Sequence, residues 1–452
     1  MTRISRLLVI SRGEIAVRTI RTAAEMGITT IAAYSSADEG SLPVTLADES
    51  INIGGAQAKK SYLNHEAILE AARDTNADAI HPGYGFLSES ADFAHKVEDA
   101  GLVWVGPSGD TISRMGDKAT AIKTAEAAGV PVVPGSGGVV TDVDAALAAA
   151  EHVGFPMMIK STAGGGGRGI HVARDEDELR SGFASATQEA QALFGDGGVY
   201  LERLVPLARH IEVQVLGDGT HAVHLYERDC SLQRRRQKIW EEAPAAILSP
   251  AVREKMCAAA AALAESVQYC GAGTVEFLYD PATEEYFFIE MNTRIQVEHP
   301  ITEEICGVDL IRGMLLVAQG EPLPYRQEDI SIRGHAIEVR VNSEDPDADF
   351  RPGPGTIETL RWPAGPGVRI DSMAFAGYTI PPYYDSLIGK LIVWAETREL
   401  ALARLGRALA ETELDGPATT LPFFGRLLQQ EDVVANEFHT TWIETWLEEG
   451  PR

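Results

Sequence analysis

The first 115 residues alternate short apolar runs with helical patterns, and this alternation constrains the fold more than any other feature of the sequence. Residues 6–10 and 29–34 have the apolar, β-branched character of strands, and the helical pattern between them ends at Gly27. Strands that alternate with helices predict a parallel, Rossmann-like sheet with helices on both faces. Further short strands are expected at residues 77–80 and 102–105.

The remaining pattern divides the chain further, as expected for 452 residues, about three times the ~150 residues typical of one domain. Residues 132–205 form an α+β pattern around a glycine run, longer strands begin near residue 210, and the region beyond Pro322 is rich in strands and turns. We therefore expect a protein of mixed α/β and α+β class. Its domains are predicted at residues 1–115, at 116–320 with a small lobe over about 132–205, and at 330–440, the last one β-rich.

Composition excludes several classes of function. With 39 Lys and Arg against 66 Asp and Glu the formal charge is −27, so an open nucleic-acid-binding surface is not expected. An anionic ligand would need a local positive pocket. The four cysteines are too widely spaced for a disulfide framework or a zinc site, which indicates free thiols in a reducing compartment. With neither a signal peptide nor a membrane span in the pattern, a cytoplasmic protein is expected.

Four consecutive glycines, residues 164–167, stand between two predicted strands and are flanked by Lys160 and Arg168. Bare backbone amides can approach phosphate oxygens closely, so the run indicates a phosphate-binding loop. It is not a Walker loop, because no Gly-Lys-Ser/Thr follows. The alternative is a flexible surface loop. Lys118 is a second candidate phosphate ligand, although a lysine at a helix start is also typical of a solvated surface.

A second group of polar residues follows Ile289. Strand alternation would place every second side chain on one face, and Glu276 stands mid-strand between apolar neighbours, where a carboxylate needs a partner. Two carboxylates and an amide oxygen suit Mg²⁺, and one further carboxylate could act as a base. The alternative is a solvated strand face. The residues expected on the shared face are Glu290, Asn292, Arg294, Gln296 and Glu298.

The densest positive charge comprises Arg234, Arg235, Arg236 and Lys238. These cations could supply the local potential that the net charge opposes, or they could form a surface patch balanced by Glu241 and Glu242. A weaker pattern is the alternation of Glu338, Arg340 and Asn342 on a predicted strand, which places another arginine near its end.

Together these motifs resemble biotin carboxylase, the ATP-grasp component of biotin-dependent carboxylases such as acetyl-CoA carboxylase. The resemblance spans about residues 4–440 and is most specific in the uninterrupted run from Glu290 to Pro300, because other ATP-grasp ligases share the carboxylates but not this string. It implies an ATP-grasp fold whose glycine lobe acts as a lid. The other matching segments are residues 12–16, 81–89, 115–118, 160–169, 227–231 and 377–386.

The resemblance implies that ATP phosphorylates bicarbonate to carboxyphosphate, whose carboxyl group then passes to a nitrogen of biotin. It implies that Glu298 is the base, that Arg340 stabilises the oxygen of deprotonated biotin, and that Lys238, Arg294 and Val297 bind bicarbonate. The implied ligands of Mg²⁺ or Mn²⁺ are Glu276, Glu290 and Asn292. The implied ATP ligands are Lys118, Lys160, Gly166, Gly167, Glu202, Leu204, His210, Gln233 and, more weakly, Arg236.

The sequence departs from the family pattern at Ser11, where asparagine is usual, at Ala163, which replaces the first of five glycines, and at Arg236, where histidine or asparagine is common. With no Met-Lys-Met biotin-attachment motif in the sequence, biotin is expected on a separate carrier protein, and the carboxyltransferase is expected on another polypeptide. The resemblance also implies a homodimer. The final carboxyl acceptor stays open. Two other hypotheses are an ATP-grasp ligase that joins a different carboxylate to an amine, and a nucleotide-binding regulatory protein.

Overall fold

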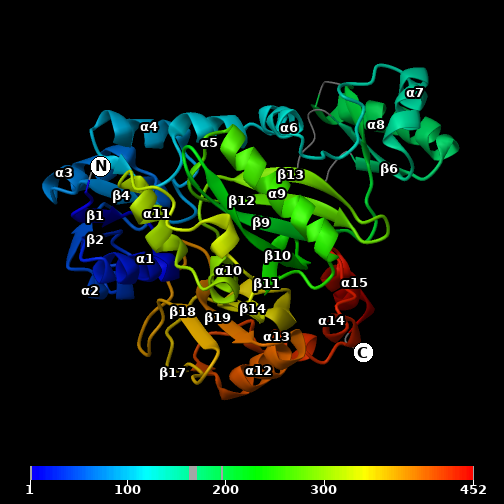
Figure 1. Cartoon of the computed structure of the whole chain (residues 1–452). Helices are drawn as coiled ribbons and strands as arrows, with labels where there is room; N and C mark the ends of the chain where they lie inside the picture. Colours follow the sequence, from blue (N-terminus) through cyan, green and yellow to red (C-terminus); the bar gives the residue numbers. More distant parts are fainter. Residues whose placement is uncertain (1–2, 162–169, 195–196, 451–452) are drawn as a thin grey trace. The chain divides into compact units, whose positions relative to one another are not determined.

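The computed structural model describes residues 3–161, 170–194 and 197–450 (Figure 1). The chain forms two compact units. The first comprises Met1–Val130, Arg209–Phe277 and Glu290–Arg452, and the second comprises Pro131–Ala208 and Leu278–Ile289. Among the described residues, no helix is both long and apolar enough to cross a membrane.

The first unit begins with the predicted parallel sheet, in the strand order β3-β2-β1-β4-β5. Alternate side chains of β1 enter two different cores: Leu7 packs with Ile20 of α1, and Leu8 packs with Phe93 of α4. Helices therefore cover both faces, as predicted. The elements are β1 (Arg6–Val9), α1 (Gly13–Glu25), β2 (Thr29–Tyr34), α2 (Leu42–Leu46), β3 (Glu49–Asn52), α3 (His65–Asp74), β4 (Ala79–His81), α4 (Ala91–Asp99) and β5 (Val103–Trp104).

An eight-stranded sheet carries most of the remaining strands, in the order β13-β12-β9-β10-β11-β14-β19-β18. The strands after residue 330 thus continue the sheet of the central strands. Residues 278–289, at the turn of the β12–β13 hairpin, belong to the second unit. The strands are β9 (Arg209–Asp218), β10 (Ala222–Arg234), β11 (Gln237–Ala243), β12 (Cys270–Asp280), β13 (Glu285–Asn292), β14 (His335–Asn342), β18 (Val368–Ser372) and β19 (Leu387–Ala395).

The helices near this sheet include four in the C-terminal part. Trp442 and Trp446, one helical turn apart, stack at 5.7 Å and pack on a shared aromatic core. The helices are α5 (Gly109–Gly116), α6 (Lys118–Ala127), α9 (Pro250–Ser266), α10 (His299–Cys306), α11 (Leu310–Ala318), α12 (Arg398–Glu411), α13 (Leu421–Leu427), α14 (Glu431–Val434) and α15 (Trp442–Glu449). Short strands are β15 (Glu344–Asp345), β16 (Arg351–Pro352), β17 (Thr359–Arg361) and β20 (Glu413–Asp415).

Helix α9 ends at Ser266, because Gln268 adopts a left-handed conformation (φ 51°) and the chain turns into β12. The extended segment predicted through Glu298 ends at Asn292. Pro300 lies in the first turn of α10, where proline fits a helix best, so Glu298 becomes the residue that precedes the helix.

The second unit has a three-stranded antiparallel sheet in the order β7-β6-β8, packed with two helices. Its core includes Met157, Ile159, Phe183 and Leu201. The elements are α7 (Val143–Val153), β6 (Met157–Ser161), β7 (Ile170–Ala173), α8 (Glu176–Phe194) and β8 (Val199–Arg203). The predicted glycine loop, with Gly166, Gly167 and the substitution Ala163, lies outside the described residues.

Candidate active site

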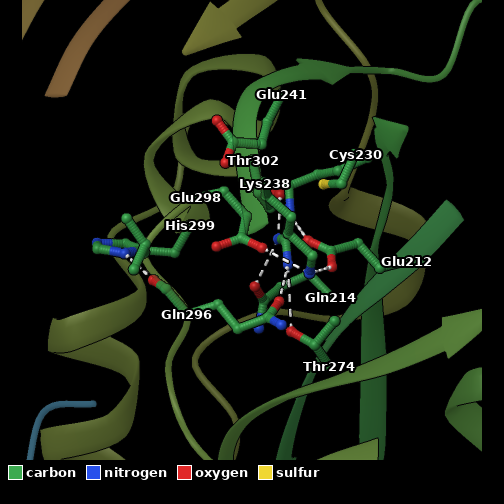
Figure 2. Close-up of polar contacts among 12 residues, drawn as sticks. Glu212, Gln214, Cys230, Lys238, Glu241, Thr274, Gln296, Glu298, His299 and Thr302 are labelled. Carbon is green, nitrogen blue, oxygen red and sulfur yellow. Dashed lines mark hydrogen bonds and ion pairs between the residues drawn. The ribbon is translucent and has the colours of Figure 1, made fainter. Parts of the chain in front are cut away.

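The site of the first unit is centred on Lys238 of β11, whose ammonium group contacts three carboxylates, of which Figure 2 labels Glu212 and Glu298. Its Nζ donates at 2.8 Å to both Glu276 of β12 and Glu298, and it also donates to Glu212 of β9. Burial disfavours the ammonium, but the three carboxylates raise the pKa of Lys238 well above its usual range. The lysine is therefore a fixed positive charge in a protein of charge −27.

Glu298 is buried between two cations. One carboxylate oxygen accepts from Lys238, and the other accepts from Arg340 at 3.0 Å. Burial opposes ionisation, but Lys238 and Arg340 lower the pKa of Glu298, so the carboxylate is ionised at neutral pH. An ionised carboxylate in this position can accept a proton.

The contacts of Arg294 differ from the expectation that it shares one strand face with Glu298. Its Nε donates to Glu89 at 2.9 Å, its Nη2 donates to Asn292 Oδ1 at 3.0 Å, and its Nη1 donates to the backbone oxygen of Ile295 at 3.3 Å. The cations in direct contact with Glu298 are Lys238 and Arg340 rather than Arg294, because the chain leaves the extended conformation after Asn292.

The predicted metal ligands come from two neighbouring strands. Glu276 Oε1 accepts from Asn292 Nδ2 at 2.8 Å, and Glu290 precedes Asn292 by two positions on β13. Burial and the charge of Glu276 raise the pKa of Glu290. Two carboxylates and an amide oxygen are hard ligands, so these residues fit Mg²⁺ or Mn²⁺.

A buried arginine supports the site and was not predicted. Arg228 of β10 donates to Glu212 at 2.6 Å and to Gln296 Oε1 at 2.8 Å, and Gln296 in turn donates to Glu276 at 3.0 Å. It also reaches Gln214, Thr274 and Thr302. The signal available in the sequence was a run of three consecutive charged residues, 227–229, inside β10.

The predicted cationic cluster does not act as a unit. Arg234 and Arg235 pair with Asp349, Arg236 is exposed, and only Lys238 turns inward. Val297 offers its carbonyl oxygen to Lys390 Nζ at 2.6 Å.

The other predicted nucleotide ligands are distributed over both units. In the first, Lys118 starts α6, Gln233 is buried on β10, and His210 lies 3.2 Å from Glu276. Burial lowers the pKa of His210, but the charge of Glu276 outweighs it and raises the value to about 9. In the second unit, Lys160 of β6 and Glu202 of β8 form an ion pair at 2.7 Å, and the backbone of Leu204 donates to Pro156.

Comparison with known proteins identifies the family. The description "Biotin carboxylase, N-terminal domain" matches residues 3–112, "Carbamoyl-phosphate synthase L chain, ATP binding domain" matches 117–326, and "Biotin carboxylase C-terminal domain" matches 338–445. Biotin carboxylase 1 of Bacillus subtilis is 51% identical over 444 residues, which cover 98% of this chain and 99% of that protein. The chain belongs to the biotin carboxylase family.

Other relatives agree with this assignment. The biotin carboxylase of Haemophilus influenzae is 50% identical over 432 residues, which cover 95% of this chain and 96% of that protein. The biotin carboxylase domain dimer of Hydrogenobacter thermophilus 2-oxoglutarate carboxylase, solved with MgADP, ADP and bicarbonate, is 44% identical and superimposes with a TM-score of 0.85 over 98% of each chain. The chain is thus an ATP-dependent biotin carboxylase of the ligase kind with an ATP-grasp fold, as the sequence predicted.

Proposed function

We propose that the cluster of Lys238, Glu298 and Arg340 is the reaction centre of this biotin carboxylase. The supporting observation is that one buried, ionised carboxylate contacts a lysine and an arginine at the same time. This arrangement suits a reaction between anions, since fixed cations offset the repulsion between reactants and a carboxylate takes up the proton.

In the first half-reaction bicarbonate binds to Lys238, Arg294 and the backbone of Val297. Lys238 has three N–H donors, and bound bicarbonate exchanges for one of its carboxylate contacts. Glu298 accepts the bicarbonate proton while the freed oxygen attacks the terminal phosphorus of ATP, which breaks the bond to ADP and forms carboxyphosphate. In the second half-reaction the departing phosphate takes the proton from the biotin nitrogen, and the carboxyl group of carboxyphosphate forms a bond to that nitrogen, while Arg340 holds the developing negative charge on the biotin oxygen.

Phosphoryl transfer depends mainly on positioning and charge neutralisation. Glu276, Glu290 and Asn292 would hold Mg²⁺ or Mn²⁺, which neutralises phosphate charge when bound. The proposed ATP ligands are Lys118, Lys160, Gly166, Gly167, Glu202, Leu204, His210, Gln233 and Arg236, of which Arg236 is the weakest because it stands where the family has another residue.

The proposal extends to partners and domains. Biotin is delivered on a separate carrier protein, and a carboxyltransferase passes the carboxyl group to the final acceptor. We also propose a homodimer, a cytoplasmic location, and the domain division at residues 1–115, 116–320 and 330–440, with residues 132–205 acting as a lid.

The test is ADP formation by the purified chain. We expect ADP formation to require bicarbonate and Mg²⁺ together and to rise when free biotin is added. Folded protein that binds ATP but releases ADP at the same rate without bicarbonate would contradict the proposal. That result would favour another ATP-grasp ligase if a carboxylate other than bicarbonate stimulated ADP release. It would favour a nucleotide-binding regulatory protein if no carboxylate did.

A further inference from the structure

Two buried glutamates lie directly opposite each other behind Arg340. Glu241 of β11 and Glu338 of β14 are register partners in an antiparallel strand pair, so their side chains share one face of the sheet. Arg340 follows Glu338 by two positions on the same face, and Lys390 of β19 is its register partner. The two carboxyl groups and the two cations therefore form one charged layer, over which helix α10 packs.

Three of the four carboxyl oxygens of these glutamates have no hydrogen-bond partner among the described residues. Both side chains are completely buried (0% exposed). Within the described part of the chain, both carboxyl oxygens of Glu338 and one oxygen of Glu241 have no hydrogen-bond partner. A buried carboxylate without a hydrogen bond is strongly disfavoured, whereas a carboxyl group that carries a proton can donate to a neighbouring carboxylate.

The nearby cations already have partners. Arg340 donates to Glu241 at 2.6 Å and to Glu298 at 3.0 Å. Lys390 contacts Glu14 at 3.1 Å and the carbonyl of Val297 at 2.6 Å, and Asp371 lies 4.0 Å away. The charged groups that act on Glu338 from β11, β14, β19 and the start of α10 are Lys390, Glu241, Arg340 and Glu298.

We propose that Glu338 and Glu241 share a single proton and together hold Arg340 in place, which makes Glu338 a positioning residue for the carboxylation of biotin. The inference rests on the proposed role of Arg340. With one proton in the pair, Arg340 faces one carboxylate charge from this pair and one from Glu298. Loss of that proton would add a second negative charge behind the Arg340 guanidinium. The added charge would draw the guanidinium away from biotin.

The pKa shifts of the two carboxyl groups have the direction that their burial and proximity predict. Burial, above all, raises the pKa of Glu338 well above its usual range, with Lys390 opposing and Glu241 adding to the shift. Burial also raises the pKa of Glu241 to about 7, against the opposing charge of Arg340. Two adjacent carboxyl groups in a buried layer do not ionise together, as like charges at one site disfavour the second ionisation.

Infrared spectroscopy of the full chain tests the shared proton directly. We expect the wild type at pH 7 to show a carbonyl band of a protonated carboxyl group that Glu338→Gln removes, because Glu241 then ionises against Arg340. The matched control Glu413→Gln removes a surface carboxylate paired with Arg361 and should keep the band. A wild-type spectrum and a Glu338→Gln spectrum with the same protonated-carboxyl bands would overturn the proposal.

The pH profile tests the positioning role. Glutamine at position 338 cannot ionise, so the loss of biotin-stimulated ADP formation at alkaline pH should move upward by about one pH unit or more relative to the wild type. A purely structural role of Glu338 would not shift the alkaline limb of the pH profile. If the alkaline limb of Glu338→Gln lies at the same pH as that of the wild type, the positioning role is overturned. If that variant does not fold by circular dichroism, Glu338→Leu, also uncharged, takes its place in both measurements.

The two proposals fail in different ways. If wild-type ADP formation does not respond to biotin, the proposed function fails, while the infrared comparison still decides the shared proton. If the wild type responds to biotin but the band does not depend on residue 338, the shared proton alone is contradicted.

Discussion

At the scale of single residues, the chemistry depends on which group holds a proton. Glu298 is the carboxylate that two cations keep ionised, and its neighbour Lys238 keeps its own charge because three carboxylates surround it. The lowered pKa of Glu298 means that its role as a base is present at neutral pH and is lost only as the pH falls through this lowered value.

Glu298→Gln keeps the shape of the side chain but removes its capacity as a base. We expect bicarbonate-dependent ADP formation to fall by about 10²–10⁴-fold, the usual contribution of a general base. The measurement is steady-state ADP release, with Glu413→Gln as the control at a surface glutamate. An unchanged rate in the folded variant would remove Glu298 from this role.

At the scale of elements, buried ion pairs connect strands to the C-terminal segment. Arg209 of β9 donates to Asp229 of β10 at 2.6 and 2.9 Å, donates to the backbone oxygens of Asn436 and Phe438, and stacks on the Phe438 ring at 3.8 Å. Asp229 is 2% exposed, so Arg209 forms a buried ion pair with it.

Arg209→Met should lower the free energy of unfolding by about 3–5 kcal/mol, because it leaves a buried carboxylate unpaired. Chemical denaturation measures the change, and hydrogen exchange should accelerate in α14 and α15. The control Arg407→Met breaks a half-exposed pair with Glu411 and should cost at most about 1 kcal/mol. Equal losses in the two variants would refute this account of the C-terminal segment.

The pair of Glu242 with Arg398 and His335 gives a pH dependence of stability. Burial opposes ionisation, but hydrogen bonds from His335 and Arg398 lower the pKa of Glu242 well below its usual value. Its stabilisation is therefore present above the unfolded pKa and disappears as the pH falls through the folded one. Glu242→Gln should be less stable than the wild type at pH 7, with the difference shrinking below about pH 4. A difference that is constant from pH 7 to pH 3 would be inconsistent with this linkage.

The strands and the site residues also show how much of the structure the sequence could predict. The short apolar runs predicted β1 and β2 closely, but β3 was missed, since three of its four residues are exposed and lack a strand pattern. Strand alternation predicted a shared polar face after Ile289, whereas the roles of Lys238, Glu298 and Arg340 came from the family resemblance. The pairing of the site residues was not predicted, because Lys238 meets Glu212 and Glu298 across 26 and 60 residues, and only the strand order brings them together.

At the scale of the whole molecule, proposed nucleotide ligands occur in both compact units. Lys160→Met removes the cation paired with Glu202 in the second unit. We expect it to weaken MgADP binding by about 10–100-fold, as loss of a charged hydrogen bond does. Calorimetry of the full chain measures this, with the exposed Lys255→Met as control. MgADP should also raise the thermal midpoint of the wild type more than that of Lys160→Met. Equal affinities in the two variants would exclude Lys160 as a ligand.

The most direct test of the central claim follows an oxygen atom. If bicarbonate attacks the terminal phosphorus of ATP while Glu298 takes its proton, one bicarbonate oxygen stays with phosphorus when the carboxyl group leaves for biotin. With oxygen-labelled bicarbonate, ATP, Mg²⁺ and biotin, mass spectrometry should therefore find one labelled oxygen in each phosphate released through carboxybiotin formation. Unlabelled phosphate formed together with carboxybiotin would contradict the account.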